Sequence, residues 1–153
     1  MTSEQIYQFL PPNLRSFFLI ESSLTSNASP VQQSIQAFAE AVRLLFSVAS
    51  PTKVVTVVFA GREVTIEISA AEFTHKLIPP TLHLTLNHHT IYLDVVSAIQ
   101  YNYEEQVACY LEELVHAFMN TSDEMLTHKI VELLYPKVTF NGITFQKLVN
   151  DLP

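Results

Sequence analysis

The chain has 153 residues, of which 48% are hydrophobic and 15% charged, a composition typical of one globular domain with a substantial core. Its formal net charge is −7, and its eight Lys and Arg residues are scattered singly. Because nucleic acids and anionic membranes are bound by clustered basic residues, we expect neither as a partner. One cysteine and two glycines also exclude an intrachain disulfide, a cysteine-rich zinc ribbon and a glycine-rich phosphate-binding loop.

Residues 1–29 predict an N-terminal extension, because one short amphipathic stretch is followed by loop-forming residues at 21–29. The start of the chain has no basic leader region. Its longest apolar run, residues 17–20, is too short to direct export or to span a membrane. We therefore expect a cytoplasmic protein with no membrane segment, and a single domain at residues 30–153.

The first half of that domain predicts a helix followed by two hairpins. Pro30 opens the helix with Ser29 as its N-cap, and Pro51 ends the apolar pattern. Residues 54–59 and 64–68 read as strands joined by a turn containing Gly61. Residues 82–86 and 91–95 form the second expected hairpin.

The second half predicts two helices and a small hairpin. The first helix covers residues 103–120, and residues 121–124 resemble a capping box for a second helix that ends near Pro136. Asn141-Gly142 then predicts a tight turn between residues 138–140 and 143–145. This order favours the α+β class, with an antiparallel or mixed sheet of two main hairpins packed against helices.

The motif with the most chemical content is E-E-L-V-H at residues 112–116, inside the first of these helices. Glu112 and His116 are four residues apart and therefore share one helix face with Cys109. An apolar stripe occupies the opposite side: Val107, Leu111, Leu114, Val115 and Phe118. The polar face has two interpretations, the solvated side of an ordinary amphipathic helix or the lining of a cleft that holds a metal ion.

The motif and the order of elements resemble the zincin superfamily of metallopeptidases in a minimal or degenerate form. The family motif is H-E-x-x-H, so here Glu112 replaces the first histidine. The resemblance implies a divalent metal, zinc or another ion, held by Glu112 and His116, with Glu113 as general base. The third ligand stays open between Asp123, Glu124 and His128, and the implied activity is hydrolysis of a protein or peptide.

The alternative is a non-catalytic protein-interaction module that binds no metal and could form a homodimer. Its contact surface would be the apolar run at residues 17–20 or the edge strand of a hairpin. Stoichiometric metal in the purified protein would distinguish the two hypotheses.

Overall fold

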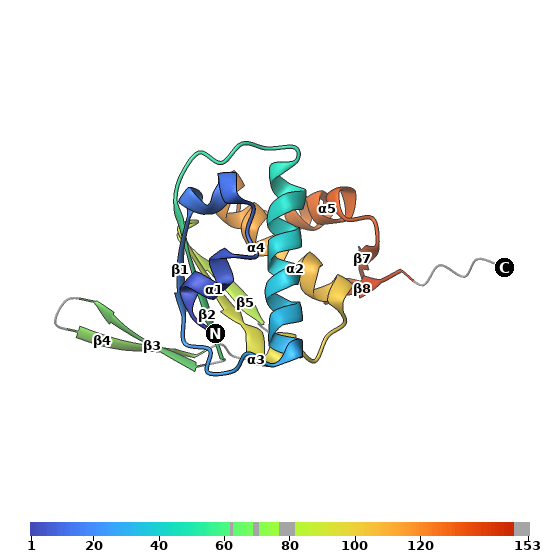
Figure 1. The fold of residues 1–153 in the computed structure, drawn as a ribbon. Helices are drawn as coiled ribbons and strands as arrows, with labels where there is room; N and C mark the ends of the chain where they lie inside the picture. The colour runs from blue at the N-terminus through green and yellow to red at the C-terminus, as the bar shows by residue number, and fades with distance from the viewer. Residues whose placement is uncertain (62, 69–70, 77–81, 149–153) are drawn as a thin grey trace.

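The computed structural model describes residues 1–61, 63–68, 71–76 and 82–148, and side chains are described for 1–61 and 82–148 (Figure 1). Two short helices, α1 (Ser3–Tyr7) and the 3-10 helix η1 (Pro12–Phe17), precede strand β1 (Phe18–Ser22) and helix α2 (Ser29–Phe46). The remaining elements are β2 (Val55–Ala60), β3 (Glu63–Ile68), β4 (Ala71–Lys76), β5 (His83–Leu86), β6 (Thr90–Asp94), α3 (Val95–Ala98), α4 (Tyr103–Met119), α5 (Glu124–Leu134), β7 (Val138–Phe140) and β8 (Phe145–Lys147).

The main sheet has four strands in the order β1-β2-β6-β5. The pairs β1–β2 and β2–β6 are parallel, whereas β5 pairs antiparallel with β6, so the sheet is mixed. The hairpin predicted between residues 82–86 and 91–95 is therefore confirmed, and its turn is tight because Asn87 and His88 adopt positive φ angles of 50° and 57°. The predicted α+β class with helices packed on a mixed sheet is also confirmed.

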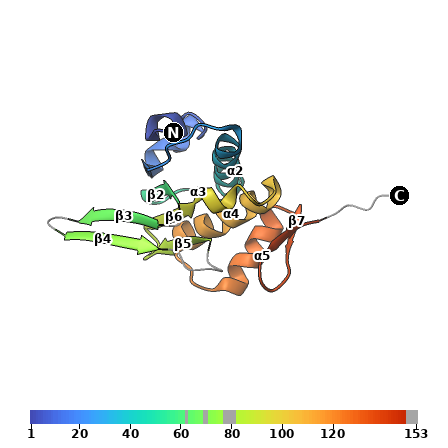
Figure 2. The ribbon, with the colours of Figure 1, turned by 90° about the horizontal axis from the view of Figure 1, so that it is seen from below.

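The hairpin predicted between residues 54–59 and 64–68 is wrong. β2 lies in the centre of the sheet between β1 and β6, and β3 pairs with β4 instead. The reason is visible in the apolar sequence of β2, which is buried along nearly all its length as expected for a strand with parallel neighbours. The β3–β4 ribbon projects from the rest of the molecule in both views (Figures 1 and 2), and Arg62 of the expected turn lies outside the described residues.

The first 29 residues, expected to form an extension, contribute a strand and apolar side chains to the same core. β1 is an edge of the main sheet, with Phe18 and Ile20 buried, while Leu19 is 53% exposed. Ile6 of α1, Leu14 of η1 and Leu10 between these helices also belong to the core. The apolar run at residues 17–20 thus belongs largely to an edge strand, whose side chains at positions 18 and 20 are buried in the core while Leu19 is exposed.

Helices α2 and α4 pack on one face of the sheet and on each other. Apolar side chains from this face join those of both helices in one core, as in the contact between the Phe38 and Phe59 rings, whose centroids are 5.1 Å apart. The opposite sheet face carries a small separate cluster of Val58, Ala60 and Tyr92. Among the described residues, no helix combines the length and apolar character needed to cross a bilayer.

The predicted helices and the last hairpin are present, with differences at their ends. The N-cap of α2 is Ala28 rather than Ser29, although Pro30 does lie in the first turn. The N-cap of α5 is Asp123, whose side chain accepts a hydrogen bond from the Leu126 amide, so the capping box expected at residues 121–124 is displaced. The final hairpin pairs β7 with β8 around Gly142, which has a φ of 95°.

Candidate metal centre

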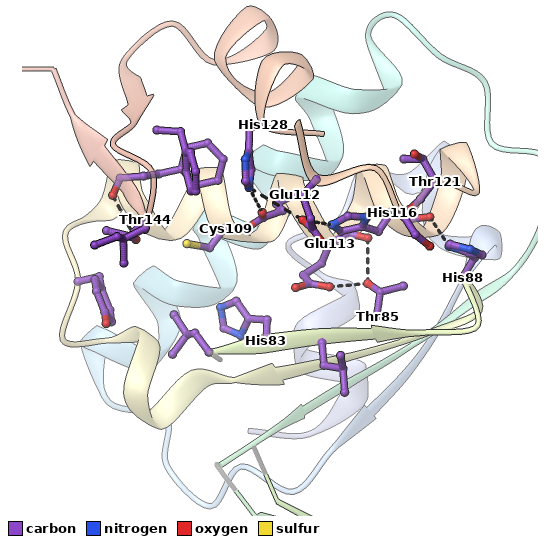
Figure 3. A pocket seen from close by; sticks show the side chains of 18 residues that line it. His83, Thr85, His88, Cys109, Glu112, Glu113, His116, Thr121, His128 and Thr144 are labelled. Atoms are coloured by element: carbon purple, nitrogen blue, oxygen red, sulfur yellow. Dashed lines mark hydrogen bonds and ion pairs between the residues drawn. The ribbon is translucent and has the colours of Figure 1, made fainter. Parts of the chain in front are cut away.

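The polar face of α4 lines a pocket of about 650 Å³. Its walls come from α4, strand β5, the start of α5 and the β7–β8 hairpin (Figure 3). All five residues of the predicted apolar stripe are buried on the core side of α4, whereas Cys109, Glu112 and His116 face the pocket. The polar face of α4 therefore lines a cleft instead of forming a fully solvated side of the helix.

Helix α5 brings further acidic and imidazole groups to the same place. Glu112, Glu124 and His128 each offer one ligand atom, and these atoms all lie within 4.8 Å of one another. His128 Nε2 is 2.8 Å from Glu112 Oε1 and 3.9 Å from Glu124 Oε2. The neighbouring imidazole of His116 places its Nε2 3.2 Å from Glu124 Oε2. Two carboxylates and two imidazoles from two helices thus converge at the pocket.

The hydrogen bonds of His116 fix which of its nitrogens faces this cluster. Its Nδ1 lies 2.8 Å from the carbonyl oxygen of Thr121, so Nδ1 carries the proton that is donated. The Nε2 atom of His116 therefore faces the Glu124 carboxylate, and a contact between this nitrogen and a carboxylate oxygen needs a proton or a cation between the two atoms. An imidazole oriented in this way by a backbone carbonyl is the usual arrangement of a metal-ligating histidine.

Aromatic packing holds the second imidazole. The His128 ring stacks on Phe140 with centroids 3.6 Å apart and meets the edge of Phe145 at 5.5 Å. Burial lowers the pKa of His128, although the nearby Glu124 charge acts in the opposite direction. A partly buried neutral imidazole with a fixed ring is suited to ligate a cation.

The two adjacent glutamates lie in surroundings that disfavour their charged forms. Burial, together with the charges of Glu113 and Glu124, raises the pKa of Glu112 to about 8. Burial also raises the pKa of Glu113 to about 7, against the lowering effect of its hydrogen bond from Thr85. Charged carboxylates buried close together without a positive partner destabilise the fold. Strongly shifted pKa values of this kind concentrate at functional sites.

Glu113 points away from the other carboxylates toward strand β5. The Thr85 hydroxyl contacts the Glu113 carboxylate through Oε2 and also lies 3.2 Å from its backbone oxygen. Glu113 is only 8% exposed, yet it lines the pocket together with Glu112 and His116. The motif therefore directs its two glutamates differently, one to the His–Glu cluster and one to the strand beneath it (Figure 3).

Of the three residues considered for a third ligand, Glu124 and His128 lie in the cluster, and Asp123 serves as the α5 N-cap. The site predicted from the sequence did not include Thr85 and His83 of β5, which line the pocket beside the motif helix. The signal was available in the alternation of β5, where these two polar residues occupy the positions between leucines. The predicted site also did not include His88, whose Nδ1 donates to the His116 carbonyl oxygen at 2.9 Å and so ties the β5–β6 turn to α4.

No family model matches this chain, and searches against curated proteins and solved structures gave no significant match. The function is therefore inferred from the site itself.

Proposed function

We propose that this protein is a metal-dependent hydrolase whose site resembles that of a minimal zincin. Glu112, His116, Glu124 and His128 would hold a divalent cation, and Glu113 would transfer the proton. The observation that supports this most strongly is the convergence of Glu112, Glu124 and His128 within 4.8 Å at the wall of a pocket. The His116 ring, which the Thr121 carbonyl oxygen orients through Nδ1 so that Nε2 lies 3.2 Å from Glu124 Oε2, supports it independently.

The donor set fits a divalent first-row metal. Imidazole nitrogens and carboxylate oxygens are ligands for zinc, manganese and iron. Because this set contains no thiolate, it favours the harder ions more than a cysteine-rich site does. A cation there would offset the mutual repulsion of Glu112 and Glu124, which contributes to the raised pKa of Glu112. When bound, the metal would supply Lewis acidity toward a carbonyl group and a water molecule.

In this proposal Glu113 would transfer the proton during hydrolysis. Its Oε2 takes the Thr85 hydrogen bond, which orients the carboxylate and leaves Oε1 for exchange of a proton. Oε1 would accept a proton from the attacking water and return it to the nitrogen of the leaving amine, so that the carboxylate is regenerated. The neighbouring pocket is large enough for a short peptide segment, which makes a peptide bond the substrate proposed here.

Metal binding by the full-length protein tests the proposal. After dialysis against a chelator, calorimetric titration with Zn²⁺ and Mn²⁺ is expected to give one bound ion per chain. Because loss of a group that only orients a ligand costs 10- to 100-fold in affinity, His116→Ala and His128→Ala are each expected to weaken binding by about 100-fold or more. His89→Ala is the matched control, since His89 is an exposed residue of the β5–β6 turn.

Equal affinity in the wild-type protein and both site variants would place the ion elsewhere and contradict the assignment. Absence of binding at micromolar metal would contradict the metal centre altogether. The interaction module without metal would then be the hypothesis to pursue, starting with the oligomeric state of the protein in solution.

A further inference from the structure

The imidazole of His83 is a buried polar group that the proposed metal centre does not use. His83 begins strand β5, is 6% exposed and lines the same pocket as Glu113. Its ring rises from the strand toward α4 (Figure 3). Within the described part of the chain, its Nε2 has no hydrogen-bond partner and essentially no contact with solvent.

The other ring nitrogen fixes the tautomer. The backbone N–H of Asp94 donates to His83 Nδ1 at 3.1 Å, so Nδ1 is the acceptor and Nε2 carries the proton. Burial lowers the pKa of His83 to about 3, which keeps the ring neutral at physiological pH. His83 is thus a permanent hydrogen-bond donor with an unused N–H.

The ring is also held in position from the core side. The Tyr110 ring lies against it with centroids 4.9 Å apart, and the Tyr110 hydroxyl is hydrogen-bonded in turn to Ser34 on α2. Buried N–H groups without partners are rare in proteins because they lose their bonds to water and gain none in exchange. A fixed, unpartnered donor at the wall of a pocket indicates a ligand that supplies the acceptor.

The remaining walls suggest the chemical class of that ligand. Apolar and aromatic side chains make up much of the lining: Leu82, Tyr101, Phe140, Ile143 and Phe145. A carbonyl oxygen next to an apolar side chain would therefore satisfy both the donor and the walls. Since Nε2 is closed to solvent, its neighbours must shift slightly as the carbonyl approaches, and burial of the apolar group would compensate for that cost.

We propose that the His83 Nε2–H group donates a hydrogen bond to the amide carbonyl of a peptide-like ligand whose adjacent apolar side chain lies against the aromatic wall of the pocket. His83 would then be a substrate-binding residue that determines where the carbonyl lies. Its part in hydrolysis rests on the proposed function above, whereas binding of the amide itself does not require the metal.

Two amide substitutions separate the roles of the two ring nitrogens. In His83→Gln the side-chain amide can place an N–H near the position of Nε2, and in His83→Asn the amide oxygen can replace Nδ1 as the acceptor for Asp94. The probe is N-acetyl-phenylalaninamide, titrated into full-length protein labelled with ¹⁵N. In the wild-type protein we expect the ¹⁵Nε2 and Hε2 signals of His83 to shift with saturation.

We expect His83→Asn to weaken binding of the probe by about 3- to 10-fold, as for loss of one neutral hydrogen bond, and His83→Gln to restore most of the affinity. His89→Ala should bind as the wild-type protein does. The titration is run without metal and again with Zn²⁺ present. The wild-type spectra report on His83 directly, so the test does not depend on the folding of any variant.

The outcomes separate this inference from the proposed function. Failure of the probe to bind, or binding that leaves the His83 signals unmoved and is equal in all variants, would overturn the role of His83 even in a protein that binds zinc. Binding that depends on His83 in a protein that takes up no zinc would support the inference while the metal-dependent hydrolase is rejected.

Discussion

At the scale of single residues, the site is defined by how adjacent side chains of one helix diverge. Glu112 joins Glu124 and the imidazoles, whereas Glu113 turns toward Thr85 on β5. The sequence predicted the shared face of Glu112 and His116, since it follows from helical spacing alone. It could not choose among Asp123, Glu124 and His128, because that choice depends on how α5 crosses α4. The structure brings Glu124 and His128 to the cluster and leaves Asp123 as a cap.

The proposed role of Glu113 can be tested by Glu113→Gln. Glutamine keeps the shape of the side chain and can still accept the hydrogen bond from Thr85. It cannot take up a proton, so we expect kcat of the metal-loaded protein on a mixture of fluorogenic peptides to fall by about 100-fold or more, with the fold retained. Glu105→Gln is the matched control, because Glu105 lies on the same helix and does not line the pocket. Equal activity in the two variants would refute the assignment.

At the scale of elements, sequence patterns were sufficient to predict strand pairs whose two strands are joined by a short turn. The second hairpin and the one around Gly142 were predicted because their turns lie within the segments that pair. The position of β2 between β1 and β6 was not predicted, because parallel strands are joined by a long connection that leaves no turn signal in the sequence. The strand β1 was missed for the same reason, although its apolar run was noticed.

Strand β1, which was not predicted from the sequence, is held at the edge of the sheet by the side chain of Tyr7. The Tyr7 hydroxyl donates to the Phe18 carbonyl oxygen at 2.7 Å and accepts from the Ile20 amide at 3.0 Å. A side chain from the N-terminal segment thus occupies backbone groups of an edge strand that could otherwise pair with another chain. The first 29 residues stabilise the sheet as well as contributing a strand to it.

We therefore expect Tyr7→Phe to lower the free energy of unfolding by about 1 to 3 kcal/mol, because two backbone groups lose their partner at a partly buried position. Urea denaturation measures the loss, and hydrogen exchange of the Ile20 amide should accelerate. Tyr101→Phe is the control, since the Tyr101 side chain is 44% exposed. A change in exchange confined to other strands would show that Tyr7 acts only through packing.

At the scale of the whole molecule, His83 also links the pocket to the pH dependence of stability. Burial lowers the pKa of His83 in the folded protein to about 3, whereas the unfolded chain protonates near the ordinary value of about 6.5. Between these values the unfolded state binds a proton that the folded state does not. Stability is therefore complete above about pH 6.5 and is lost progressively as pH falls toward 3.

A neutral residue at this position should remove that part of the pH dependence. From pH 7 to pH 5 we expect the free energy of unfolding of the wild-type protein to fall by about 2 kcal/mol more than that of His83→Gln, because only the wild-type protein carries this imidazole. This is a large share of the 5 to 15 kcal/mol typical of a domain. Urea denaturation of both metal-free proteins at the two pH values isolates the effect, since all other titrating groups are common to them. Parallel losses in the two proteins would mean that the folded protein protonates His83 readily, and the ring would then not be the fixed neutral donor inferred for the pocket.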